Sequence, residues 1–177
     1  MNIVSRGVFV LFAIVAVTLI AHSQGATTIP DQVKKLYKFI GNWEGEGNMA
    51  LYGKSHKMSM KHANTMVASG WGVNVDEISN TEGMGEYHAA NILGYDSKTD
   101  TYHAYAVDNK GSVHDYHGKW DTDSSLVLED EGTMKGKKLQ ETITVTFSGD
   151  DSYRFTIHAT LDGKEMENAE AVVHKVK

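Results

Sequence analysis

Short segments in which apolar and polar residues alternate are the feature that most constrains the fold of this chain. Ile143, Val145 and Phe147 alternate with three threonines, and residues 153–161 continue the same pattern. Successive side chains of a β-strand point to opposite faces. The alternation therefore predicts strands with one face in a core and the other in water.

Glycines and short polar stretches divide the chain into about ten such segments at near-even spacing. Even spacing with tight turns favours an antiparallel up-and-down meander, closed into a barrel so that no strand edge is exposed. A two-sheet sandwich is the structural alternative. The expected strands cover residues 42–52, 55–68, 71–79, 86–94, 101–107, 112–120, 125–130, 138–147, 152–161 and 165–176.

One short helix is expected before the strands. Pro30 opens the segment, and Val33, Leu36 and Ile40 follow at helical spacing. Gly41 is a plausible C-terminal stop. The predicted fold class is thus all-β, an antiparallel up-and-down barrel of about ten strands with a short N-terminal helix.

The N-terminus has the three parts of a secretory signal peptide. A basic start ends at Arg6, residues 7–21 are apolar, and small residues follow. The chain is therefore expected to divide into a signal peptide, residues 1–25, and a barrel domain, residues 26–177. This predicts a periplasmic or secreted protein with no stable membrane anchor after cleavage. An uncleaved anchor is the alternative, although the apolar run is shorter than the ~20 residues that a spanning helix needs.

Composition limits the partners of the chain. The formal net charge is −6, and no stripe of lysine or arginine is visible. Nucleic acids and anionic membranes attract clustered positive charge, so neither is an expected partner. The sequence has no cysteine, so its stability must come from core packing and backbone pairing.

The string Gly41-Asn42-Trp43, placed just after the helix and at the start of the first strand, resembles the lipocalin signature. That resemblance implies that Trp43 plugs the closed end of the barrel and that the helix covers it. Trp43 is therefore one of the candidate ligand-binding residues.

Further strings are similar to a family of exported bacterial calycin (lipocalin-like) domains of unknown function. They are Ile92-Leu93-Gly94-Tyr95-Asp96, Val107-Asp108 and Gly118-Lys119-Trp120-Asp121. The similarity extends over essentially the whole chain after the signal segment. It implies a calycin barrel and no characterised activity.

A second resemblance points to haem. Gly41-x-Trp43-x-Gly45-x-Gly47 is similar to the motif of the nitrobindins, which are small haem-binding β-barrels. In that family a single histidine near the C-terminal end binds the haem iron. The candidates here would be His158 and His174.

A hairpin between residues 101 and 120 carries the other candidate ligand-binding residues. Asp108-Asn109-Lys110-Gly111 suits a type I turn followed by a glycine bulge. That register pairs Tyr105 with Asp115 and His103 with His117. A two-residue loop would instead pair Tyr105 with His114.

This patch of two histidines, a tyrosine and a carboxylate has two interpretations. On the inner face of a barrel it would be a polar ligand wall, and on the outer face it would be a cross-strand ladder. Because converging polar groups could orient a bound molecule, we predict that His103, Tyr105, Asp115 and His117 line the cavity.

Signals of catalysis are absent from the sequence. No nucleophile elbow, phosphate loop or dense metal-ligand spacing occurs, and acidic runs such as Glu129-Asp130-Glu131 are expected to be solvated. We therefore expect an exported barrel that binds a small, partly apolar molecule, with no catalytic residues, metal or cofactor. The alternatives are a haem-binding barrel, a calycin-fold enzyme that uses the His/Tyr/Asp patch, and a protein–protein interaction module.

Overall fold

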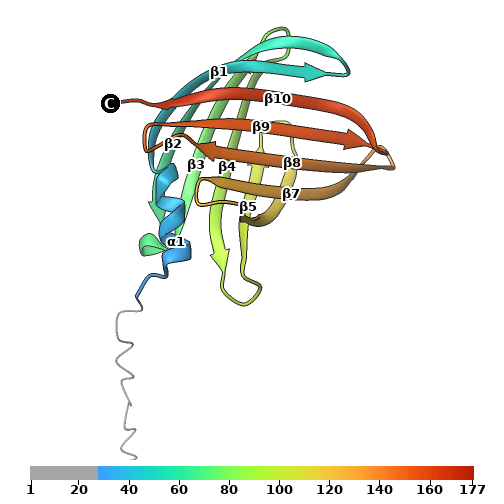
Figure 1. The fold of residues 1–177 in the computed structure, drawn as a ribbon. Helices are drawn as coiled ribbons and strands as arrows, with labels where there is room; N and C mark the ends of the chain where they lie inside the picture. The colour runs from blue at the N-terminus through green and yellow to red at the C-terminus, as the bar shows by residue number, and fades with distance from the viewer. Residues whose placement is uncertain (1–27) are drawn as a thin grey trace, which may run out of the picture.

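The structure is a computed structural model that describes residues 28–177. The predicted signal peptide falls on residues outside this range. Figure 1 shows the strands curving around a common interior, with α1 beside one end of the barrel.

The described chain forms one closed antiparallel barrel in which every strand pairs with its sequence neighbours and β1 also pairs with β10. The predicted fold class is therefore confirmed, and the two-sheet sandwich is not formed. The elements are α1 (Asp31–Lys35), the 3-10 turns η1 (Leu36–Phe39) and η2 (Ala68–Gly70), and the strands β1 (Gly41–Leu51), β2 (Lys54–Val67), β3 (Gly72–Thr81), β4 (Gly85–Asp96), β5 (Thr101–Asp108), β6 (Val113–Trp120), β7 (Ser125–Met134), β8 (Lys137–Phe147), β9 (Ser152–Leu161) and β10 (Lys164–Lys175).

The expected strand limits agree with the observed ones within two residues, except at the end of β7. That strand was expected to stop at Asp130, because charged residues and a glycine follow. It continues to Met134, and the turn is made by Lys135 and Gly136, which both have positive φ. Asp130 therefore belongs to the barrel wall.

The β5–β6 hairpin has the register that the glycine-bulge turn predicts. Tyr105 pairs with Asp115 and His103 with His117. Gly111 has a φ of +86°, and its N–H donates to the Asp108 carbonyl at 3.3 Å. The alternative two-residue loop, which would pair Tyr105 with His114, is not formed.

Aromatic side chains close the barrel at the end that α1 and η1 cover. Trp43 is fully buried there, and its indole N–H donates to the Phe39 carbonyl at 2.7 Å. The Trp43 ring lies 4.9 Å from that of Tyr153 and 6.5 Å from that of Phe147, between centroids. The tryptophan therefore plugs this end, as the lipocalin resemblance implies.

The two glycines that follow Trp43 have a structural role. A Cβ at Gly45 or Gly47 would collide with the backbone of β10, at the carbonyls of Val172 and Glu170 respectively. The repeated glycines of the first strand let two strands approach closely. The glycine–tryptophan motif is thus explained by packing.

Residues 28–177 contain no helix with the length and hydropathy that a membrane span requires.

Candidate functional site

The barrel encloses a cavity of about 950 Å³, which is within the range of small-molecule sites in proteins. Phe39 and Tyr153 form part of its floor near the closed end. Residues of the turns at the opposite end, such as Lys110 and Lys135, border its mouth. The cavity is therefore deep, with one closed and one open end.

Most of the cavity wall is apolar and adaptable. Methionine is prominent in it, with Met49, Met58 and Met60 on the first two strands. Because methionine is flexible and polarizable, it can pack against ligands of irregular shape. Small side chains on β5, Ala104 and Ala106, leave room in the opposite wall.

One polar group lies near the closed end and consists of His62, Glu77 and Tyr153. His62 and Glu77 are direct cross-strand partners on β2 and β3. Nδ1 of His62 lies 2.5 Å from the Tyr153 hydroxyl, and Nε2 lies 3.9 Å from a carboxylate oxygen of Glu77. Nε2 is buried and has no hydrogen-bond partner among the described residues.

Burial disfavours the charged form of each member of this group. It lowers the pKa of His62 to about 4 and raises that of Glu77 to about 7, against a smaller opposing effect of the Ser79 hydroxyl. Burial also raises the pKa of Tyr153, so its phenol keeps the proton. An acid–base group with a pKa near 7 in an apolar cavity is a common mark of a functional site.

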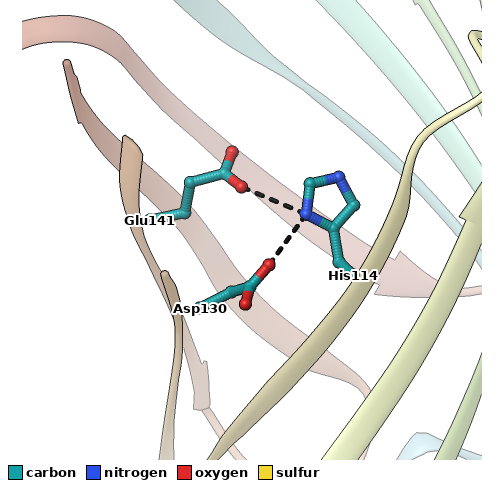
Figure 2. Close-up of side chains that lie close together, drawn as sticks. All are labelled: His114, Asp130 and Glu141. Carbon is teal, nitrogen blue, oxygen red and sulfur yellow. Dashed lines mark hydrogen bonds and ion pairs between the residues drawn. The ribbon is translucent and has the colours of Figure 1, made fainter. Parts of the chain in front are cut away.

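A second polar group comes from the strands β6, β7 and β8. Figure 2 shows the imidazole of His114 pointing at the carboxylates of Asp130 and Glu141. Nδ1 of His114 lies 3.0 Å from Asp130 Oδ2 and 3.2 Å from Glu141 Oε2. The Tyr116 hydroxyl donates a longer hydrogen bond, 3.4 Å, to the same oxygen of Glu141.

These contacts favour an imidazolium. The hydrogen bond to Glu141, followed by that to Asp130, raises the pKa of His114 to about 9, although burial acts in the opposite direction. His114 is therefore charged at neutral pH and donates between two carboxylates. The same three side chains could hold a divalent cation, because one atom of each lies within 4.8 Å of the others, but the cation would have to replace the proton on Nδ1.

The predicted ligand-binding patch faces outward. His103, Tyr105 and His117 lie on the outer surface of β5 and β6 and do not border the cavity, whereas Asp115 reaches its edge. The Nδ1–H of His103 donates to Asp115 Oδ1 at 3.0 Å, so the patch is a cross-strand ladder. The expectation that His103, Tyr105 and His117 line the cavity was wrong, because the inner face of β5 carries Ala104 and Ala106 instead. The predicted register of the hairpin was right.

The haem hypothesis does not fit the histidines that it named. His158 and His174 are both exposed on the outer face of the barrel, so neither could bind an iron inside it. The histidines that do face the cavity, His62 and His114, hydrogen-bond to other side chains of the wall.

The residues that the sequence analysis missed are polar side chains at inward positions of otherwise apolar faces. His62 follows Met58 and Met60 on one face of β2, and Glu77 follows Val73 and Val75 on β3. Residues two apart along a strand lie on the same face, so the apolar neighbours at i−2 and i−4 indicated that these side chains point inward. Asp130 was expected to be solvated, but it is half-buried because it shares the inner face of β7 with Leu126 and Leu128.

Comparison with known proteins supports the fold. A family model described as "Protein of unknown function (DUF1579)" matches residues 30–175. The structure is similar to that of an S-type phycobiliprotein lyase from Guillardia theta, with a TM-score of 0.58 and 9% identity over 81% of this chain and 92% of that chain. No curated protein matches the sequence. The likeness supports the calycin-like barrel predicted from the sequence.

Proposed function

The chain belongs to the DUF1579 family of proteins of unknown function, and we propose that it binds a small, partly apolar molecule inside its barrel. The observation that carries the proposal is the cavity of about 950 Å³, which combines an apolar wall with the buried pair His62 and Glu77. Pockets of this size with a few convergent polar groups are typical of small-molecule sites.

The similar lyase is consistent with this proposal. Its name describes an enzyme that acts on phycobiliproteins, and the shared fold supplies a barrel that encloses space. Because fold alone does not define a ligand, the chemistry of the cavity wall must supply the specificity.

We also propose that the barrel is exported and works in the periplasm or as a secreted protein. The support is the charged, apolar and small-residue order of the N-terminal segment. The intact mass of the protein recovered from culture medium or periplasm tests this. A loss of about 23–25 residues is expected from the position of the small residues, and recovery of the full chain in the membrane fraction would contradict export.

An enzyme is the second candidate, and the cavity rather than the outer patch supports it. Glu77 has a pKa of about 7, the range that suits a general acid–base group. A ligand held beside Glu77 could exchange a proton with it, while His62 stays neutral and donates from Nε2.

Native mass spectrometry of gently purified protein separates these candidates. A co-purifying molecule of unchanged chemistry supports binding, and its time-dependent conversion supports an enzyme. A bare barrel in a stable complex with another protein would contradict both and favour an interaction module.

Two neighbouring substitutions on β5 provide the matched control. Ala106 lines the cavity, whereas Val107 is exposed on the outer face. Ala106→Phe fills the cavity and should abolish retention of the ligand, while Val107→Phe should retain it. Equal retention by both variants would place the ligand elsewhere.

A further inference from the structure

The hydrogen bond between His62 and Tyr153 fixes the position of a proton. The Tyr153 hydroxyl has no other acceptor among the described residues, so it donates to Nδ1 of His62. Because a neutral imidazole carries one proton, that proton then lies on Nε2. Nε2–H is the buried donor that lacks a partner.

The unpartnered donor faces Glu77 across a gap. The separation of 3.9 Å between Nε2 and the carboxylate is too long for a hydrogen bond, for which about 2.7–3.2 Å is usual. An oxygen atom placed beside both groups could accept from Nε2–H and donate a proton to the carboxylate. A hydroxyl group has this combination of acceptor and donor.

Charge around the cavity selects against anions. Glu141 and Glu167 also border it, and the imidazolium of His114 is already held by two carboxylates. Lys110 and Lys135 lie at the mouth, away from the closed end. At pH 8, above the pKa of Glu77, a ligand carboxylate beside it would therefore meet like charge, with no free cation near it among residues 28–177.

We propose that His62 and Glu77 bind a neutral hydroxyl group near the closed end of the cavity, so that the barrel selects amphipathic alcohols over fatty acid anions. This inference rests on the proposed binding function and deepens it. The apolar body of the alcohol would lie along Met58 and Met60, which share the inner face of β2 with His62.

Competition between matched ligands tests the proposal. The neutral fluorescent probe N-phenyl-1-naphthylamine is bound to the purified protein at pH 8. It is then displaced by decan-1-ol or by decanoate, which differ only in the head group. We expect decan-1-ol to displace the probe at a concentration about tenfold lower, the effect of one well-placed polar contact.

Three variants assign the difference to the pair. His62→Phe should raise the required concentration of decan-1-ol about tenfold. Glu77→Gln removes the charge but keeps a polar group, so it should bring the two ligands to within about threefold of each other. Asp76→Asn, on the outer face of the same strand, should change nothing.

The outcomes separate this inference from the proposed function. If the probe does not bind the wild-type barrel, the binding function itself is contradicted. If the probe binds but decanoate competes as well as decan-1-ol, or if Glu77→Gln leaves their ratio unchanged, only the selection of hydroxyl groups is overturned. Glu77→Gln decides the matter even where His62→Phe fails to fold.

Discussion

His62 and Glu77 are paired directly across the β2–β3 ladder, and both side chains point into the barrel with 3.9 Å between Nε2 and the carboxylate. Burial acts on them in opposite senses, because it disfavours the charged form of each group. The pKa of His62 falls to about 4 and that of Glu77 rises to about 7. At pH 7 His62 is therefore neutral, whereas Glu77 is close to the midpoint of its titration.

Glu77→Gln should stabilise the protein at high pH. Below pH 4.5 the carboxyl is protonated in both states, whereas between about 4.5 and 7 only the unfolded state loses the proton, so wild-type stability falls as pH rises. A pKa raised from 4.5 to about 7 corresponds to roughly 3 kcal/mol. In urea denaturation at pH 4.5, 6 and 8, the free energy of unfolding of Glu77→Gln should increasingly exceed that of the wild type, up to this limit. Asp76→Asn is the control, and a gain that does not vary with pH would contradict the assignment.

The His114 ion pairs should stabilise the protein at acidic and neutral pH and lose this effect at high pH. The raised pKa means that their contribution is fully present below pH 6.5 and is lost as pH rises through about 9. The shift corresponds to roughly 3 kcal/mol. An NMR titration should give a midpoint near 9 for His114, and Asp130→Asn should lower it. Asp115→Asn, which alters an exposed residue beside His114 on β6, should leave the His114 midpoint unchanged. A midpoint near 6.5 in the wild type would refute the ion pairs of His114 with Asp130 and Glu141.

Trp43 should be essential to stability. It is fully buried, and truncation of a buried aromatic side chain to alanine costs about 3–5 kcal/mol. Trp43→Ala should therefore lower the free energy of unfolding by that amount. Trp71, which is 40% exposed, provides the comparison, and Trp71→Ala should cost about 1 kcal/mol or less. Equal losses for the two variants would show that Trp43 does not plug the barrel.

Much of the fold was predictable because it depends on local chemistry. Alternation along β8 and β9 marks the strands, and the turn residues Asp108 and Gly111 suggested the register that β5 and β6 adopt. The same register left the orientation of the hairpin undecided. Ala104 and Ala106 on one face and His103 and Tyr105 on the other do not say which side is inside, because that depends on how all ten strands close.

The candidate site was less predictable for a related reason. Asp130 and Glu141 are distant from His114 in sequence and meet only when β6, β7 and β8 pair. In the sequence, a polar residue on an inward face is marked only by its spacing of two from the apolar residues of that face. Without the barrel, such a residue cannot be distinguished from an exposed one.

The outer patch should not contribute to ligand affinity. His103→Ala and Tyr105→Phe change side chains that do not border the cavity, so the affinity for N-phenyl-1-naphthylamine should remain that of the wild type. Ala104→Leu projects into the cavity and should weaken binding by at least about tenfold, the effect of roughly 1.4 kcal/mol of lost contact. The reverse pattern, with loss only in the patch variants, would place the ligand on the outer face.

The most direct test of ligand binding inside the barrel is methyl NMR of the protein labelled with ¹³C at its methionine methyl groups. Met58 and Met60 line the cavity, whereas Met66 lies on an exposed part of β2, the same strand. On titration with N-phenyl-1-naphthylamine, the signals of Met58 and Met60 should shift and saturate together while that of Met66 stays in place. A saturable shift of Met66 with Met58 and Met60 unchanged would contradict binding in the cavity.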